Sequence, residues 1–341
     1  MAHRLVTVHD VAARSGVSIA TVSRALREPH RVSEDTRDRV LAAVRDLGYR
    51  PNRAASSLRR GRTGVIALVV PDIVNPYFSS LTKGAQGLSR ERGYGLVVVD
   101  TTELAEVEAE EIAALRSQID GIILASSRLP DDRLVEVMST TTCVLINRDL
   151  SELGVTAPTV TIDERSGART AVGHLYDLGH RRIAYVGGPE RSWSQGRRAH
   201  GTREAAAELD GVTLTEVGSF APDVDGGRAA AAAARDSGAT AVIAYNDLVA
   251  LGLLARWSET GIRVPDDVSL MGFDNTFVAE LSSPRLTSVG ADLTECGELA
   301  VELLLERIDH QEPAEAGLHR VVTPRLAVRD STAAPAGADP R

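Results

Sequence analysis

The stretch DVAARSGVSIATVSRALREP, residues 10–29, brings hydroxyl, guanidinium and small apolar side chains together at helical spacing. The candidates for contact with another molecule are Ser18, Ile19, Ala20, Thr21, Ser23 and Arg24. Serine and threonine hydroxyls can bond phosphates or bases, and the fork of Arg24 matches guanine O6 and N7. Ile19 and Ala20 offer only apolar contact, for instance with a thymine methyl. A phosphate clamp is the other role open to Arg24.

Three short helices must position these side chains. The sequence predicts helices over about 8–15 and 19–27, with Gly16 supplying a left-handed turn between them. Ser33 caps a third helix that ends at Gly48. Two helices joined by a glycine-containing turn, with a third beside them, form a helix-turn-helix, whose second helix enters the major groove of DNA.

Apolar residues at helical spacing give each helix an inner face. The predicted core of this head consists of Val8, Val11, Ala12, Val22, Ala25, Leu26, Val40, Leu41, Val44 and Leu47.

The charge of the chain is divided unevenly. Residues 1–62 hold 13 arginines against 6 acidic residues, a net charge of +7, within a chain of net charge −9. The remaining residues therefore carry −16. A basic head on an acidic body favours a nucleic-acid-binding module, and a pair of solvated charged helices is the alternative.

The segment VTVHDVAARSGVSIATVSRALREPHRVSEDTRDRVLAAVRDLGYRPNRAASSLRRGRTGVIALVVPD resembles the start of a lac-repressor-family (LacI/GalR) transcriptional regulator. The resemblance runs without gaps over about 70 residues and continues more weakly to about residue 329. It implies a helix-turn-helix head and a two-lobed, periplasmic-binding-protein-like type-I core. It also implies a homodimer that binds palindromic double-stranded operator DNA, with affinity set by a small-molecule effector.

The segment YRPNRAASSLRRG suggests a short helix over about 52–59. A helix of this length is marginal in isolation, and on the residues alone a charged flexible linker is the simpler interpretation. The resemblance implies instead a hinge helix that folds on DNA and inserts Leu58 into the minor groove. Asn52, Arg53 and Arg59 would then contact DNA as well.

From Gly64 onward, short apolar runs alternate with helical stretches: VIALVVPD, GLVVVDT, GIILAS, CVLIN, RIAYVGG, AVIAY and VSLMGF. This rhythm predicts an α/β fold with doubly wound parallel sheets. The domains we expect are a DNA-binding head over 1–50, a hinge over 51–62, a core over 63–330 and a disordered tail over 331–341. The expected N-lobe comprises 64–162 and 291–323, and the C-lobe 163–290 and 324–330.

The resemblance places an effector cleft between the lobes. The residues it selects are Tyr77, Phe78, Asn147, Ser192, Trp193, Ser194, Arg198, Phe220, Asn246 and Asp274. Amide, carboxylate and guanidinium groups suit vicinal hydroxyls, and aromatic faces cover sugar C–H surfaces, so a carbohydrate is the expected ligand. A cleft arginine without a ligand would be an uncompensated charge, which favours a binding role for Arg198. Phe220 could instead belong to the core, and Asn246 and Asp274 could cap helices.

Other functions remain open at this stage. A purine or another metabolite could replace the sugar, and the regulator could also lack an effector. A solute-binding protein would share the core but would need a signal peptide, and the sequence shows no h-region. An enzyme on this fold is disfavoured because no GxSxG, HExxH, P-loop or strand-following GxGxxG motif occurs. We expect no metal, cofactor or membrane segment, a dimer, and a cytoplasmic protein associated with the nucleoid when bound to DNA.

Overall fold

The computed structural model describes residues 6–49, 62–310 and 319–335. The chain divides into two compact units, residues 1–63 and 64–341, which we call the head and the core. The predicted hinge helix over 52–59, with Asn52, Arg53, Leu58 and Arg59, lies outside the described residues.

The head contains the predicted helices. Its elements are α1 (Val8–Ser15), α2 (Ile19–Arg27), the short 3-10 helix η1 (Pro29–Arg31) and α3 (Glu34–Leu47). Gly16 and Gly48 end α1 and α3 with φ of 66° and 62°, a left-handed conformation that glycine adopts without strain. The two glycine turns are therefore confirmed. Ser33 does stand before α3, but its Oγ donates to Thr36 Oγ1 at 3.0 Å and accepts no backbone N–H, so the predicted side-chain cap is wrong.

The core of the head differs from the prediction at one position. Val11, Val22, Ala25, Val40 and Ala43 are its buried residues, and the other predicted apolar positions, Leu41 excepted, pack around them. The prediction was wrong at Leu41, because the face of α3 that packs against the other helices carries Ala43 instead.

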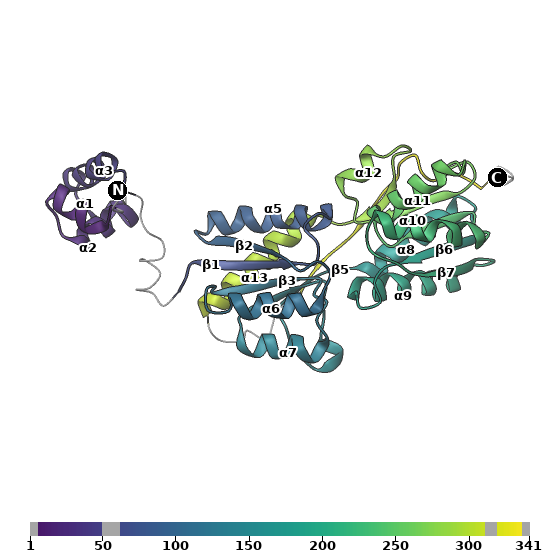
Figure 1. Cartoon of the computed structure of the whole chain (residues 1–341), viewed down its shortest axis with the longest axis horizontal. Coiled ribbons are helices and arrows are strands. Elements are labelled where there is room, and N and C mark those ends of the chain that lie inside the picture. The colour runs from purple at the N-terminus through teal and green to yellow at the C-terminus, as the bar shows by residue number, and fades with distance from the viewer. Residues whose placement is uncertain (1–5, 50–61, 311–318, 336–341) are drawn as a thin grey trace. The chain divides into compact units, whose positions relative to one another are not determined.

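The N-lobe of the core is a parallel sheet with the strand order β11-β5-β4-β3-β1-β2. Its elements are β1 (Val65–Val70), α5 (Pro76–Glu91), β2 (Gly95–Asp100), α6 (Ala105–Leu115), β3 (Gly121–Ala125), α7 (Asp131–Thr140), β4 (Cys143–Ile146), η2 (Ser151–Leu153), β5 (Thr159–Ile162), α13 (Leu293–His310) and β11 (His319–Val322). Figure 1 shows α13, in yellow-green, among these blue elements.

The C-lobe repeats this plan with the order β12-β10-β9-β8-β6-β7, in which only β12 is antiparallel. Its elements are α8 (Glu164–Asp177), β6 (Arg182–Gly187), α9 (Trp193–Glu208), β7 (Thr213–Ser219), α10 (Val224–Asp236), β8 (Ala241–Ala244), α11 (Asp247–Glu259), β9 (Ser269–Phe273), α12 (Phe277–Leu281), β10 (Thr287–Gly290) and β12 (Arg325–Ala327). The predicted α/β fold of two doubly wound sheets is confirmed.

The chain crosses between the lobes three times: after β5, after β10 and after β11. Each sheet therefore contains strands from distant parts of the sequence. Because both sheets are parallel where they meet these crossings, the carboxyl ends of their strands face the region between the lobes, where ligands of open α/β sheets bind.

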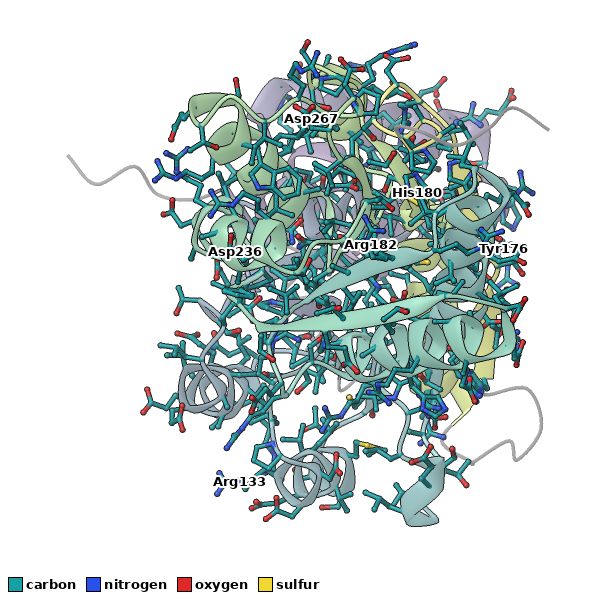
Figure 2. All side chains as sticks on the ribbon, turned by 90° about the vertical axis from the view of Figure 1, so that its right-hand side faces the viewer. Arg133, Tyr176, His180, Arg182, Asp236 and Asp267 are labelled. Atoms are coloured by element: carbon teal, nitrogen blue, oxygen red, sulfur yellow. The ribbon has the colours of Figure 1, made fainter. Side chains whose placement is uncertain are left out.

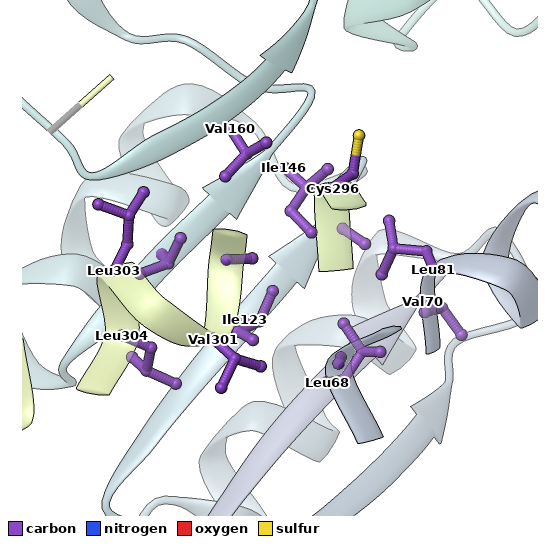
Figure 3. Packing of buried hydrophobic residues seen from close by; sticks show 14 of the residues in the cluster. Leu68, Val70, Leu81, Ile123, Ile146, Val160, Cys296, Val301, Leu303 and Leu304 are labelled. Carbon is purple, nitrogen blue, oxygen red and sulfur yellow. The ribbon is translucent and has the colours of Figure 1, made fainter. Parts of the chain in front are cut away.

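Apolar layers cover both faces of each sheet. In the layer drawn in Figure 3, side chains of β1, β3, β4 and β5 meet Leu81 of α5 and Val301 and Leu304 of α13. The contact of α5 with α13 is close because both helices present glycine. A Cβ atom added to Gly84 would lie 2.0 Å from the Thr294 carbonyl oxygen, and one added to Gly297 would lie 2.2 Å from that of Leu81.

The expected disorder from residue 331 onward is wrong for residues 331–335. Ser331 is fully buried, its Oγ donates to the Leu270 carbonyl at 2.6 Å, and it accepts from Thr287 N at 2.8 Å. His180, labelled in Figure 2, pairs through Nε2 with the Ala333 carbonyl at 2.8 Å. The small and hydroxyl-bearing residues of this segment are typical of a solvated tail, yet the hydroxyl of Ser331 makes hydrogen bonds near the amino ends of β9 and β10.

The close approach of α5 and α13 predicts opposite effects for two glycines of one helix. Gly84→Ala forces a methyl group against backbone and should lower the free energy of unfolding by about 1–3 kcal/mol. Gly87→Ala, the matched control, places a methyl where nothing lies within 4 Å. It should leave stability unchanged or raise it by up to about 1 kcal/mol. Urea unfolding measures both, and equal midpoints for the two variants would contradict this packing.

Candidate functional site

The exposed side of α2 carries the residues expected to contact DNA. Ala20 and Arg24 are exposed and stand one helical turn apart, while Ile19, Thr21 and Ser23 are half-buried. Ser18 Oγ accepts from Thr21 N at 3.1 Å and lies 2.9 Å from Thr21 Oγ1. Ser18 is therefore the helix cap, which leaves the Ala20 and Arg24 edge of α2 as the most accessible surface.

A cavity in the core lies where strand ends of both lobes face each other. We call it the cleft, and its lining residues are Asn75, Tyr77, Phe78, Glu103, Ser126, Arg128, Asn147, Ser194, Arg198, Pro222, Tyr245, Asn246 and Asp274. Its volume is about 20 Å³, which suits a single water molecule. In this arrangement of the lobes the cavity does not hold a sugar, so a ligand of that size requires groups of the lining to move.

Arg198 on α9 is the centre of the C-lobe side. Its Nε and Nη2 donate to Glu164 at 2.7 and 2.9 Å, and Nη2 also donates to Asp274 at 2.8 Å. Nη1 donates to the Tyr245 carbonyl at 2.6 Å, and all three ionised side chains are at most 7% exposed. The expectation of an uncompensated arginine is wrong, because two carboxylates already balance this charge.

This buried cluster holds two carboxylates for one guanidinium. Burial raises the pKa of Asp274, and Arg198 opposes that rise. Removing one partner from a buried ion pair costs about 3–5 kcal/mol, so Arg198 supports the fold as well as lining the cleft.

The N-lobe side of the cleft is held by an amide and a second arginine. Asn147 Nδ2 donates to the Tyr77 hydroxyl at 2.8 Å, and its Oδ1 accepts from Ile162 N at 3.0 Å. Arg128 donates to both carboxylate oxygens of Glu103, at 2.6 and 3.1 Å. Polar groups from strand ends β2, β3 and β4 are therefore fixed in orientation before any ligand binds.

Backbone strain in the described residues concentrates at the same strand ends. The non-glycine residues with positive φ are Thr102, Glu103, Ser126, Asn147, Asp274 and Asn275. All of them lie within three residues after the end of β2, β3, β4 or β9. Such conformations cost about 1–3 kcal/mol each and persist where surrounding contacts impose them, typically at binding sites.

The head and the core each match a known family of domains. Residues 7–52 match the bacterial regulatory proteins of the lacI family, and residues 172–332 match the periplasmic binding protein-like domain. The HTH-type transcriptional repressor CytR of Escherichia coli (strain K12) is 33% identical over 334 residues, 96% of each chain. The chain belongs to the lacI family. It is a DNA-binding transcriptional regulator, and the relatives it matches are regulators rather than enzymes.

Solved structures of this family share the whole architecture. The lac repressor dimer bound to operator and the anti-inducer ONPF has a TM-score of 0.83 at 26% identity, covering 97% of this chain and 100% of that one. The complex of the transcriptional regulator CelR with cellobiose has a TM-score of 0.70 at 31% identity, covering 96% and 99%.

Most of the residues selected for an effector site in this lacI-family chain lie at the cleft. They are Tyr77, Phe78, Asn147, Ser194, Arg198, Asn246 and Asp274. Asn246 also caps α11, since its Oδ1 accepts from Val249 N at 2.8 Å. It is therefore both a helix cap and a residue of the cleft lining. Contact with a ligand stays a prediction for all seven.

Three selected residues lie elsewhere. Ser192 caps α9 and pairs with the Tyr245 hydroxyl at 2.9 Å, and Phe220 packs against the C-lobe core. Trp193 lines a different groove between the lobes. The loop before α9 is short, and consecutive residues on it point to different surroundings, which its sequence does not reveal.

Several residues that line the cleft were not predicted from the sequence, above all Arg128 and Tyr245. Arg128 stands two residues beyond Ser126, which directly follows β3, and Tyr245 directly follows β8. Their positions after predicted strands could have identified them, since carboxyl ends of parallel strands line such clefts.

The described residues contain no cluster of three or more histidine, cysteine or acidic residues suited to a metal ion. None of the described helices is long and apolar enough to cross a membrane.

Asp247 holds the loop that carries Asp274. It accepts from Thr276 N at 2.7 Å and from Ser288 Oγ at 2.6 Å. Burial, reinforced by the Asp274 carboxylate, raises the pKa of Asp247 from 3.8 to about 7. The folded protein thus holds this proton between about pH 4 and pH 7 while the unfolded chain releases it, so the contribution of Asp247 to stability falls as the pH rises through that range.

Asp247→Asn keeps the shape but cannot ionise. The variant should gain stability relative to the unchanged protein as the pH rises from about 5.5 to about 8, by an amount on the order of 1 kcal/mol. Urea unfolding of both proteins at the two pH values measures the difference. A stability difference that is the same at both pH values would show that Asp247 does not titrate in this range.

Proposed function

We propose that this regulator is a repressor that binds a palindromic operator as a homodimer and that a sugar bound in the cleft sets its affinity for DNA. The observation that carries the proposal is the cleft itself, where both lobes supply oriented amide, carboxylate and guanidinium groups beside aromatic side chains. Such a lining suits a small polyhydroxylated ligand. The CelR relative, whose structure holds cellobiose, supports a sugar as the ligand class.

On the DNA side, α2 enters the major groove and Arg24 reads a guanine. Ala20, one turn earlier on the exposed edge, makes apolar contact with the neighbouring base, and Ile19, Thr21 and Ser23 line the remaining interface. Asn52, Arg53, Leu58 and Arg59 supply the second contact, in the minor groove, as the family resemblance implies. Two heads related by a two-fold axis then read the two halves of the operator.

The closed cleft suggests how the ligand acts on DNA binding. A cavity of about 20 Å³ does not admit a sugar, so the ligand binds a more open arrangement of the lobes. The ligand can change DNA affinity only through its preference for one arrangement over the other. A shift of the two N-lobes in the dimer would alter the spacing of the hinge segments that precede them.

The homodimer is supported by apolar side chains on the outside of both lobes. In the N-lobe they are Ile73, Val74, Val97, Val98 and Leu104, of which Val97 and Val98 belong to the edge strand β2. In the C-lobe, Phe277 and Leu281 stand one turn apart on α12 and are 60% and 76% exposed. Large exposed apolar groups mark association surfaces, so we assign a second copy of the chain to both patches. We place the protein in the cytoplasm, at the nucleoid when bound to its operator.

Arg24→Ala tests base recognition. If Arg24 reads a guanine, the variant should lose about 1–3 kcal/mol of discrimination between an operator selected from random duplexes and unrelated DNA. Fluorescence anisotropy at fixed salt measures both affinities. Arg39→Ala, an exposed arginine of α3 paired with Asp35, is the matched control and should leave discrimination unchanged. An equal loss on all sequences would make Arg24 a phosphate contact.

A ligand panel tests the effector. Glucose, galactose, ribose, cellobiose, maltose and lactose are added to the operator complex in parallel with adenosine and hypoxanthine. At least one sugar should change the operator Kd by about 5–150-fold while binding to unrelated DNA stays constant. A response to a purine alone would replace the sugar by that class, and no response to any compound would indicate a regulator without an effector of either kind.

A further inference from the structure

A second cavity between the lobes is larger than the cleft, and of its lining residues only Trp193 belongs to the set expected to bind an effector. Its volume is about 520 Å³, within the range of small-molecule sites. One wall is a single face of α9, at Trp193, Gly196, Arg197, His200 and Arg203, and the N-lobe forms the other wall. We call this cavity the Trp193 groove.

The groove adjoins the cleft on both lobes. On α9, Trp193 lines the groove and the next residue, Ser194, lines the cleft. After β4, Asn147 lines the cleft and the next residue, Arg148, lines the groove. The two cavities therefore lie side by side along both walls, and an elongated ligand that enters when the lobes move apart can extend from the cleft into the groove.

The charges of the groove favour a neutral occupant. Its three guanidinium groups each have a carboxylate partner: Arg148 with Asp131, Arg197 with Glu152 at 3.0 Å, and Arg203 with Glu216 at 2.9 Å. Each guanidinium is therefore already balanced by a carboxylate, so a phosphate or carboxylate ligand gains little net attraction here. A hydroxyl can donate to a carboxylate and accept from a guanidinium, and the Arg148–Asp131 and Arg203–Glu216 pairs, each within one lobe, stay in place when the lobes separate.

Trp193 supplies the apolar surface that such a ligand needs. The indole is half-buried on the first turn of α9, and the Arg197 guanidinium lies over one face of the ring, 5.1 Å from its centroid, so a sugar would stack on the opposite face. The Arg197–Glu152 pair joins α9 to η2, so the ring is held next to a contact that crosses from one lobe to the other. An aromatic face beside paired charges is the arrangement that binds the C–H face and the hydroxyls of a pyranose.

We infer that the effector is an oligosaccharide of at least two rings, with one ring in the cleft and the next in the Trp193 groove. This inference rests on the proposed sugar response and specifies its ligand class. Trp193 binds the second ring, and the single ring of a monosaccharide leaves the groove unused.

Titration calorimetry on the full chain compares glucose and galactose with cellobiose, maltose and lactose. At least one disaccharide should bind about tenfold or more tightly than either monosaccharide. Trp193→Ala should weaken that disaccharide by about tenfold and change monosaccharide affinity by less than about twofold. Trp193→Phe, which keeps an aromatic face, should restore most of the loss, and unchanged thermal melting of both variants verifies their fold.

The outcomes separate this inference from the proposed function. Monosaccharide binding as tight as disaccharide binding, with no effect of Trp193→Ala, overturns the two-ring assignment and leaves the sugar response intact. An equal loss for one and two rings places Trp193 at the first ring and also overturns it. If no sugar binds the unchanged protein, both proposals fail.

Discussion

The burial of one positive charge organises the C-lobe. Arg198 lies on α9, Glu164 at the start of α8 and Asp274 directly after β9. All three side chains are buried from water. Each charge would be costly to bury alone, so each needs the other two in place. The cluster therefore ties two helices and a strand end together at the edge of the sheet. It also fixes the orientation of the polar groups on the C-lobe side of the cleft, because the hydrogen bonds of Arg198 are made before a ligand binds.

The N-lobe side of the cleft also fixes its polar groups by hydrogen bonds, with one amide and one ion pair. Asn147 bridges the Tyr77 hydroxyl and the backbone of β5, and Arg128 is held by Glu103. Burial raises the pKa of the Tyr77 phenol still further above neutral pH, so its hydroxyl remains protonated. The two sides thus differ in polarity, with a charged C-lobe side and an N-lobe side that is neutral at Asn147 and Tyr77. A ligand between them can satisfy both only when the lobes take a particular separation.

Much of this architecture could be predicted from the sequence, and the failures have physical causes. The seven apolar runs all form strands, and the caps at Gly16, Ser18 and Gly48 end or begin helices as expected. The strands that were not predicted from the sequence are β5, β7, β10, β11 and β12. Two of them, β5 and β10, bury hydroxyls, such as those of Thr161 and Ser288, whose partners His319 and Asp247 lie far along the chain. Strand β7 is an edge strand with mostly exposed side chains, so it lacks an apolar run.

The sequence predicted which residues lie at the cleft better than it predicted how their side chains contact one another. The resemblance and the strand ends led to Asn147, Arg198 and Asp274, but no local pattern shows that Glu164 and Asp274 would neutralise Arg198. Pairing of charges distant in sequence is decided by the packing of α8, α9 and β9, which periodicity does not encode. For the same reason, the positions of Trp193 and Phe220 depend on backbone direction over one or two residues.

The segment that follows β12 has a practical consequence for anyone who handles this protein. Ser331 forms hydrogen bonds with the backbone of Leu270 and Thr287, and the Ala333 carbonyl pairs with the imidazole of His180. These last described residues therefore stabilise the C-lobe sheet. A version of the chain cut after residue 330 would leave backbone groups of Leu270 and Thr287 without these partners near the amino ends of β9 and β10, which lowers the stability of the C-lobe. Purification tags are better joined well beyond residue 335.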